Sequence, residues 1–278
     1  ISPFIKIGAM EDEKFSEQVK EIILYSTTKN TSADNEDNNE LIKSGSKTFT
    51  TLDAYKNRLT DENKKVLYST DEVSQSTALN MWTSQGKEVL KLDTVIDTQF
   101  IPWLEEKNKE INFVRVDSEL DESIKDDSPE IADKDGNTKS ETLKKMISSA
   151  LNNEKVTVQV QSLKGENSPP SLILLPEQMR RINDITALME QKLPGLPEYH
   201  NLIVNSNHPL IQGLLKLNSN PIVVEGSSKS EESQLASDIA IHVYEMAKLS
   251  IGGLENKDIA AFQTRNAEVL GKLMKKFV

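Results

Sequence analysis

The chain contains no cysteine, few aromatic residues and no long apolar run. Without cysteine it can form no disulfide, thiol nucleophile or cysteine-ligated metal site, and this composition suits a cytoplasmic protein. No segment approaches the about 18 consecutive apolar residues of a membrane-spanning helix. Aromatic residues make up 5% and charged residues 28% of the chain. These values favour a helix-rich, heavily solvated protein over a compact β-sandwich.

Sequence motifs for nucleotide binding or nucleophilic catalysis are also missing. The chain has no GxxxxGK(S/T), GxGxxG or GxSxG. Its three histidines, His200, His208 and His242, share no metal-ligand spacing. We therefore expect no catalytic, cofactor-binding or metal-binding residue in this chain. The formal net charge of -11 argues against nucleic acid and anionic membranes as partners, because both are bound largely through lysine and arginine.

The first part of the chain alternates short apolar segments with helix-patterned sequence. Segments 66–69, 88–92 and 113–116 are spaced as in the βαβ units of a parallel sheet. In a nucleotide enzyme, the turn after the first strand carries glycines that approach a phosphate. Here Asp71 and Glu72 occupy that turn, where their carboxylates would repel a phosphate. Helices are expected at 11–26, 52–63, 73–85 and 98–108.

A strongly acidic stretch separates two parts of the chain. Residues 117–135 hold nine acidic and two basic side chains, a composition typical of a solvated linker. We expect a first domain over residues 1–120, an acidic linker over 121–139 and a second domain over 140–278. In the second domain, apolar periodicity predicts helices at 140–151 and 176–191, a helix start at 205–209, and strands at 156–160, 171–175 and 201–204.

The last fifty residues predict two long helices, 230–250 and 256–277, separated by Gly252 and Gly253. An antiparallel pair of this length has an apolar face that must be covered. A second copy of the chain would form a four-helix bundle, and packing on the chain's own domain is the alternative. The apolar positions proposed for the dimer interface are Leu235, Ile239, Val243, Met246, Leu249, Phe262, Val269, Leu270 and Leu273.

Two apolar groups are candidates for binding other proteins. Phe100 and Trp103 lie three residues apart on one predicted helix, and tryptophan is enriched where proteins contact one another. Met179 and Ile182, extended toward Leu175, form a methionine-containing stripe with Met189, and methionine adapts to varied apolar partners. Each group could instead be ordinary core.

Several longer runs resemble a known family. FIKIGAMEDEKFSEQVKEIILYSTTK, TLDAYKNRLTDENKKVLYST and GKEVLKLDTVIDTQFIPWLEEKNKEINFV resemble the end of the middle domain of the heat-shock protein 90 chaperones in their bacterial form. PEQMRRI, NSNHPLI and GGLENKDIAAFQTRNAEVL resemble that family's dimerisation domain. Pattern and resemblance together predict an α/β (α+β) fold: a small αβα subdomain followed by a mixed α/β C-terminal domain that ends in a helical dimerisation hairpin.

The resemblance implies a division of labour along a longer protein. The chain begins with Ile1 instead of methionine, so we expect a fragment. In the family, ATP and Mg²⁺ bind an N-terminal domain, which would lie upstream of Ile1, so this fragment itself should neither bind nor hydrolyse ATP. It would supply homodimerisation and contacts to non-native client proteins, with other chaperones as further partners. By resemblance, Leu175, Met179 and Ile182 would face the cleft between protomers, and Phe100 with Trp103 would add a second client patch.

Two other functions remain open at this point. One is a doubly wound α/β enzyme that binds a nucleotide or cofactor and carries a helical oligomerisation appendage. The carboxylates of Asp71 and Glu72 argue against it. The other is an oligomerisation module without client contact.

Overall fold

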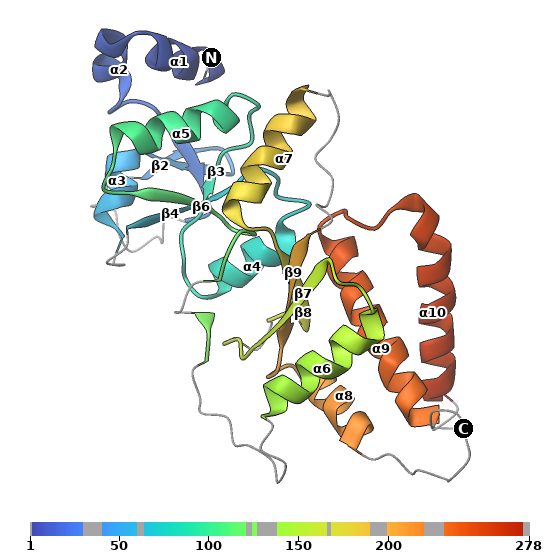
Figure 1. The fold of residues 1–278 in the computed structure, drawn as a ribbon. Helices are drawn as coiled ribbons and strands as arrows, with labels where there is room; N and C mark the ends of the chain where they lie inside the picture. The colour runs from blue at the N-terminus through green and yellow to red at the C-terminus, as the bar shows by residue number, and fades with distance from the viewer. Residues whose placement is uncertain are drawn as a thin grey trace. The chain divides into compact units, whose positions relative to one another are not determined.

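The computed structural model describes residues 2–29, 41–59, 64–120, 124–126, 138–165, 168–189, 199–219 and 231–274. The chain divides into two compact units. Unit 1 comprises Ile1–Glu119 and Glu177–Pro194, and unit 2 comprises Leu120–Pro176 and Gly195–Val278. Figure 1 shows the elements of both units.

Unit 1 is built on a mixed six-stranded sheet with the order β2-β3-β1-β5-β4-β6. The strands are β1 (Tyr25–Thr27), β2 (Leu41–Ser44), β3 (Lys47–Thr50), β4 (Lys65–Ser69), β5 (Leu90–Lys91) and β6 (Asn112–Arg115). Strand β4 pairs in parallel with both β5 and β6, which confirms the βαβ arrangement predicted from the spacing. Antiparallel pairing of β1 with β5 and β3, and of β3 with β2, extends the sheet. These three added strands were not predicted.

The helices of unit 1 are α1 (Ser2–Glu11), α2 (Glu13–Val19), α3 (Leu52–Asn57), α4 (Ser76–Ser84), α5 (Asp97–Lys107) and α7 (Glu177–Met189). Successive residues of β4 face opposite sides of the sheet. Val66 and Tyr68 pack with Phe100 of α5 in one core cluster. On the opposite face, Trp82 of α4 donates a hydrogen bond from its indole Nε1 to the Val116 carbonyl at 2.9 Å. The two crossover helices therefore cover opposite faces of the sheet (Figure 1).

The helix predicted over 11–26 is wrong beyond Val19, where α2 ends. Tyr25 and Thr27 instead form β1 and are buried between β3 and β5. Tyr25 continues the apolar helical spacing of Val19 and Ile22, so local periodicity misleads, and pairing with distant strands decides the structure.

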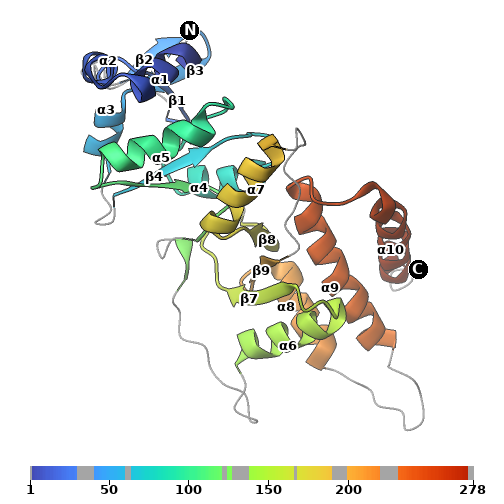
Figure 2. The same cartoon turned by 45° about the horizontal axis from the view of Figure 1, so that its top comes forward.

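Unit 2 holds a mixed three-stranded sheet with the order β7-β9-β8. The elements are β7 (Val156–Gln161), β8 (Ser171–Leu174), β9 (His200–Asn205), α6 (Lys139–Leu151), α8 (Pro209–Ser219), α9 (Glu231–Ser250) and α10 (Asn256–Met274). One apolar cluster joins the sheet to α6, α8 and α9. Strand β9 is central, parallel to β7 and antiparallel to β8. Helix α10 runs beside α9 as the second arm of a hairpin (Figures 1 and 2).

One element departs from the predicted domain division. Helix α7 lies within the predicted second domain, 140–278, and connects β8 to β9 in the sequence. Its contacts, however, assign it to unit 1, where it lies beside α5 (Figure 2). The physical reason is a set of ion pairs and hydrogen bonds from Arg180 and Arg181 to unit 1. Of the predicted acidic linker, only residues 124–126 and 138–139 are among those described.

Candidate functional site

The turn after β4 is closed by the chain's own side chains. The Gln75 Oε1 atom accepts hydrogen bonds from the Ser69 hydroxyl at 2.8 Å and from the Thr70 backbone N–H at 3.0 Å. The Asp71 carboxylate accepts from Ser74 and the Val73 amide, and these two bonds lower its pKa. Gln75 thus occupies donors that a phosphate would need, and Asp71 stays ionised beside them. This geometry does not favour a nucleotide-binding enzyme.

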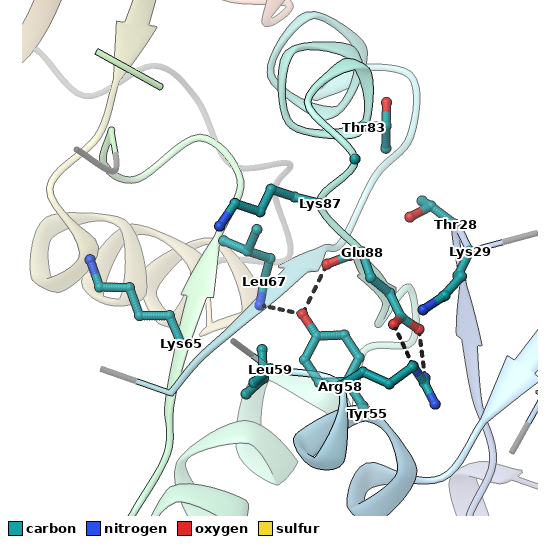
Figure 3. Close-up of a pocket in the computed structure, with 11 residues that line it drawn as sticks. Thr28, Lys29, Tyr55, Arg58, Leu59, Lys65, Leu67, Thr83, Lys87 and Glu88 are labelled. Atoms are coloured by element: carbon teal, nitrogen blue, oxygen red, sulfur yellow. Dashed lines mark hydrogen bonds and ion pairs between the residues drawn. The ribbon is translucent and has the colours of Figure 1, made fainter. Parts of the chain in front are cut away.

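A cavity of about 380 Å³ opens near the amino ends of β4 and β5 (Figure 3). Arg58 binds both carboxylate oxygens of Glu88 at 2.9 Å. The Tyr55 hydroxyl donates to the Glu88 carbonyl at 2.9 Å and accepts from the Leu67 amide at 3.2 Å. These polar groups therefore hold α3 against β4 and β5. Tyr55, Arg58 and Glu88 therefore have a structural role at this cavity.

Helix α7 is docked with its polar face inward. Arg180 is only 3% exposed, whereas Ile182 is 60% and Met189 80% exposed. Met179 and Ile185 are exposed too, and their spacing of three to four residues aligns the four side chains along one side of the helix. An amphipathic helix normally turns its apolar stripe toward the core. The reversed orientation leaves a methionine- and isoleucine-lined surface open to other molecules.

This surface, which we call the α7 stripe, consists of Met179, Ile182, Ile185 and Met189. It contains no charged side chain, and unbranched methionine can adjust to apolar partners of different shape. Exposed apolar surface of this kind marks sites of interaction with proteins or other apolar ligands. Of the residues predicted for client contact, the structure places Met179 and Ile182 on the stripe. Met189 belongs to the stripe predicted from the sequence but was not proposed for client contact, and neither was Ile185, which shares the same helical spacing.

The other predicted client residues lie elsewhere. Leu175 belongs to the core of unit 2, because it follows β8 on the side that packs against the helices. Phe100 is 0% exposed and belongs to the core of unit 1, so its prediction as an exposed client contact is wrong in this structure. Trp103 is half-buried and stacks on Phe100 with ring centroids 5.2 Å apart. Its ring therefore mainly covers the core.

The predicted dimer residues on α9 and α10 divide into two groups. Leu235, Ile239, Val243 and Val269 are buried in the core of unit 2, because they face the sheet and its helices, so their prediction as interface residues is wrong for this structure. Phe262 is half-buried and stacks on His242 with centroids 5.4 Å apart. The side chain of Leu273 lies outside the described residues.

A second group of residues on α9 and α10 is exposed to solvent. Met246 and Leu249 of α9 and Leu270 of α10 are exposed, as is Met274, which was not predicted. We call these four residues the hairpin face. Together they leave apolar surface on both arms of the α9–α10 hairpin.

Ion pairs fasten α10 to α9 along the hairpin. Arg265 pairs with Glu245, and Lys272 pairs with Asp238 at 2.7 Å. Burial alone would raise the pKa of Asp238, but the hydrogen bonds from Lys272 and Gln234, together with the positive charges of Lys272 and Arg265, outweigh it and lower that pKa. At neutral pH these ion pairs therefore hold the two helices of the hairpin together.

The three histidines have local structural surroundings. His200 is buried and its Nε2 lies 2.9 Å from the Tyr244 hydroxyl, whose pKa burial raises to about 12. Burial lowers the pKa of His242 and of His208. Within the part of the chain that the structure describes, no group of three or more His, Cys, Asp or Glu side chains could hold a metal ion. None of the described helices has the length and apolar character needed to cross a membrane.

The family model described as Hsp90 protein matches residues 1–276. The chain belongs to the Hsp90 family. This Hsp90-family chain is 30% identical over 229 residues to the chaperone protein HtpG of Porphyromonas gingivalis. It is 28% identical over 227 residues to that of Bacteroides thetaiotaomicron and 27% over 219 residues to that of Bacteroides fragilis. The match covers 76% of the chain and 30% of each relative, so the chain corresponds to only part of these relatives. The resemblance predicted from the sequence is confirmed.

Proposed function

We propose that this chain is the client-binding and dimerising part of an ATP-dependent Hsp90-family chaperone that acts in the cytoplasm. The α7 stripe binds apolar segments of non-native proteins, and the hairpin face joins two copies. ATP and Mg²⁺ act in a part of the protein upstream of Ile1, and this chain neither binds nor hydrolyses ATP by itself. Other chaperones are further partners of the assembled protein.

The outward apolar face of α7 carries the proposal. Each buried methylene group stabilises an association by about 0.8 kcal/mol, so binding that covers Ile182 and Met189 is favourable. Because the α7 stripe lacks charged groups, it imposes little selection on the sequence of its ligand. Low selectivity combined with exposed apolar area fits a protein that holds many different partly folded chains.

Suppression of client aggregation tests the α7 stripe. The double variant Ile182→Ser and Met189→Ser should lose most of the suppression that the parent chain gives to a thermally unfolding protein. Its melting temperature should change little, because exposed side chains contribute within roughly 0.5 kcal/mol to stability. Val73 and Val95 are equally exposed apolar residues of unit 1 outside α7, so Val73→Ser with Val95→Ser is the matched control. Equal suppression by both double variants would remove the α7 stripe from the mechanism.

The hairpin face supports self-association. A two-fold dimer brings the same residues of both copies together, and two α9–α10 hairpins can complete a four-helix bundle. If the chain dimerises but neither the parent nor its stripe variants suppress aggregation, it is an oligomerisation module only. A nucleotide that raises the melting temperature of this chain would instead favour the enzyme alternative, and we expect no such shift.

A further inference from the structure

The orientation of α7 is set by a cluster of charged groups. Helix α7 contacts three other elements of unit 1 through polar atoms. Arg181 donates to both oxygens of Glu105 on α5 at 2.8 and 3.0 Å. Arg180 donates to the Tyr68 hydroxyl on β4 at 2.6 Å, and its guanidinium also lies 5.7 Å from the centre of the Tyr68 ring. Arg115 on β6 reaches Asp184 of α7 at 3.4 Å.

The buried and half-buried charges of this cluster pair with one another. Glu177 accepts hydrogen bonds from Arg180 at 3.0 Å and from Arg181 at 2.7 Å, and Arg180 also binds Asp184. Burial would raise the pKa of Glu177, but the bonds from both arginines outweigh burial and lower it. Arg115 is held in turn by two bonds to Asp117. We call Tyr68, Glu105, Arg115, Glu177, Arg180, Arg181 and Asp184 the α7 clamp.

Among the side chains of α7 that the structure describes, apolar packing involves mainly Ile185. Ile185 lines a small cavity of about 50 Å³ together with Ile101 and Pro102, but the rest of the α7 stripe projects outward. Rotating the helix by half a turn would bury the stripe and expose Arg180. The hydrophobic effect favours that rotated state, because it removes apolar area from water. The paired charges oppose it, since a rotated α7 would leave the buried Tyr68 hydroxyl without the Arg180 guanidinium and would take Asp184 away from Arg115.

We propose that Arg180 and Arg181 are positioning residues that keep the α7 stripe outward, so that polar contacts and not apolar packing make the client surface available. The client part of this inference rests on the proposed function, whereas the clamp itself can be measured without any client. The planar fork of arginine matters here, because only a guanidinium can bind both oxygens of Glu105 in one plane.

Hydrogen exchange of the α7 amides tests the clamp directly. Tyr68→Phe removes one hydroxyl. Glu105 also accepts a hydrogen bond from the Phe113 backbone N–H at 3.0 Å, and Glu105→Gln keeps an oxygen that can accept this bond. We expect the α7 amides of the double variant to exchange at least tenfold faster, with α6 and β7 of unit 2 unchanged. The control is Glu72→Gln, which breaks an exposed ion pair with Lys91 in the same unit. Unchanged exchange in α7 would overturn the proposal.

Exchanging the charges of Arg181 and Glu105 provides a rescue experiment for the α7 clamp. Arg181→Glu alone should speed exchange in α7 and reduce aggregation suppression several-fold. Adding Glu105→Arg should restore a large part of both, because it re-forms the ion pair but cannot accept from the Phe113 amide, whereas the single variant Arg181→Lys should retain only part of both. Restored suppression without restored protection of α7 would also overturn the proposal. If α7 loosens but suppression is unchanged both here and in Ile182→Ser with Met189→Ser, the proposed client function fails while the clamp as a docking device stands.

Discussion

Replacing Leu270 by alanine should weaken pairing between two copies about 30-fold without destabilising the single chain. Complete burial of a leucine side chain contributes about 1.5–3 kcal/mol. Leu270 is 53% exposed, so roughly 1 kcal/mol of that contribution remains available on association. A two-fold interface uses the residue twice, which gives roughly 2 kcal/mol. Since about 1.4 kcal/mol corresponds to a tenfold change in affinity, the dissociation constant should rise about 30-fold.

Sedimentation equilibrium from nanomolar to micromolar concentration measures this change. Leu210 on α8 is a leucine of similar exposure, 42%, that lies outside the hairpin face, so Leu210→Ala should leave the dissociation constant unchanged. Thermal unfolding at a concentration where both chains are monomeric should give the same midpoint for Leu270→Ala and the parent. An unchanged dissociation constant for Leu270→Ala, or one that changes equally in the control, would refute the assignment of the hairpin face to dimerisation.

Three further outcomes follow from packing and charge. Ile147 is fully buried in unit 2, so Ile147→Ala should lower the free energy of unfolding by about 2–5 kcal/mol in urea titration. Trp82→Phe leaves the buried Val116 carbonyl without its donor and should cost about 1–3 kcal/mol in the same assay. Burial lowers the pKa of His242 below 6.5, so the unfolded chain binds a proton first as the pH falls. Stability should therefore decrease below about pH 6.5, and His242→Phe, which preserves ring stacking on Phe262, should reduce that dependence; an unchanged pH profile would contradict it.

Apolar periodicity in the sequence predicted the helices and strands that are buried along one side or along their whole length. Strand β7, with its alternating burial, and α6, with Leu143 and Ile147 inward, lie close to the expected ranges. Strand β1 was missed because three residues carry too little pattern. Its existence depends on the partners Thr48–Thr50 and Leu90–Lys91, which are distant in the sequence. Helix α1 was also not predicted.

The candidate site was only partly predictable, because periodicity identifies an amphipathic helix but not which face is covered. Which face of α7 is covered depends on its contacts to Tyr68, Glu105 and Arg115, all more than sixty residues away in the sequence. In α9, apolar residues three positions apart differ in burial. Val243 faces the core, while Met246 three residues later is exposed. A sequence stripe that included both could not separate core from interface without the tertiary structure.

Because α7 is inserted between β8 and β9, the residues that pair the two strands are separate from the residues of the α7 stripe. Four residue pairs, from Ser171 opposite Val204 to Leu174 opposite Asn201, define the register of the two strands. The intervening α7 takes no part in that ladder. Substitutions on the α7 stripe can therefore occur without shifting a strand. Under the proposed function, client preference can change at Met179 or Ile182 while the sheet, which carries the chain onward to α8 and the hairpin, keeps its register.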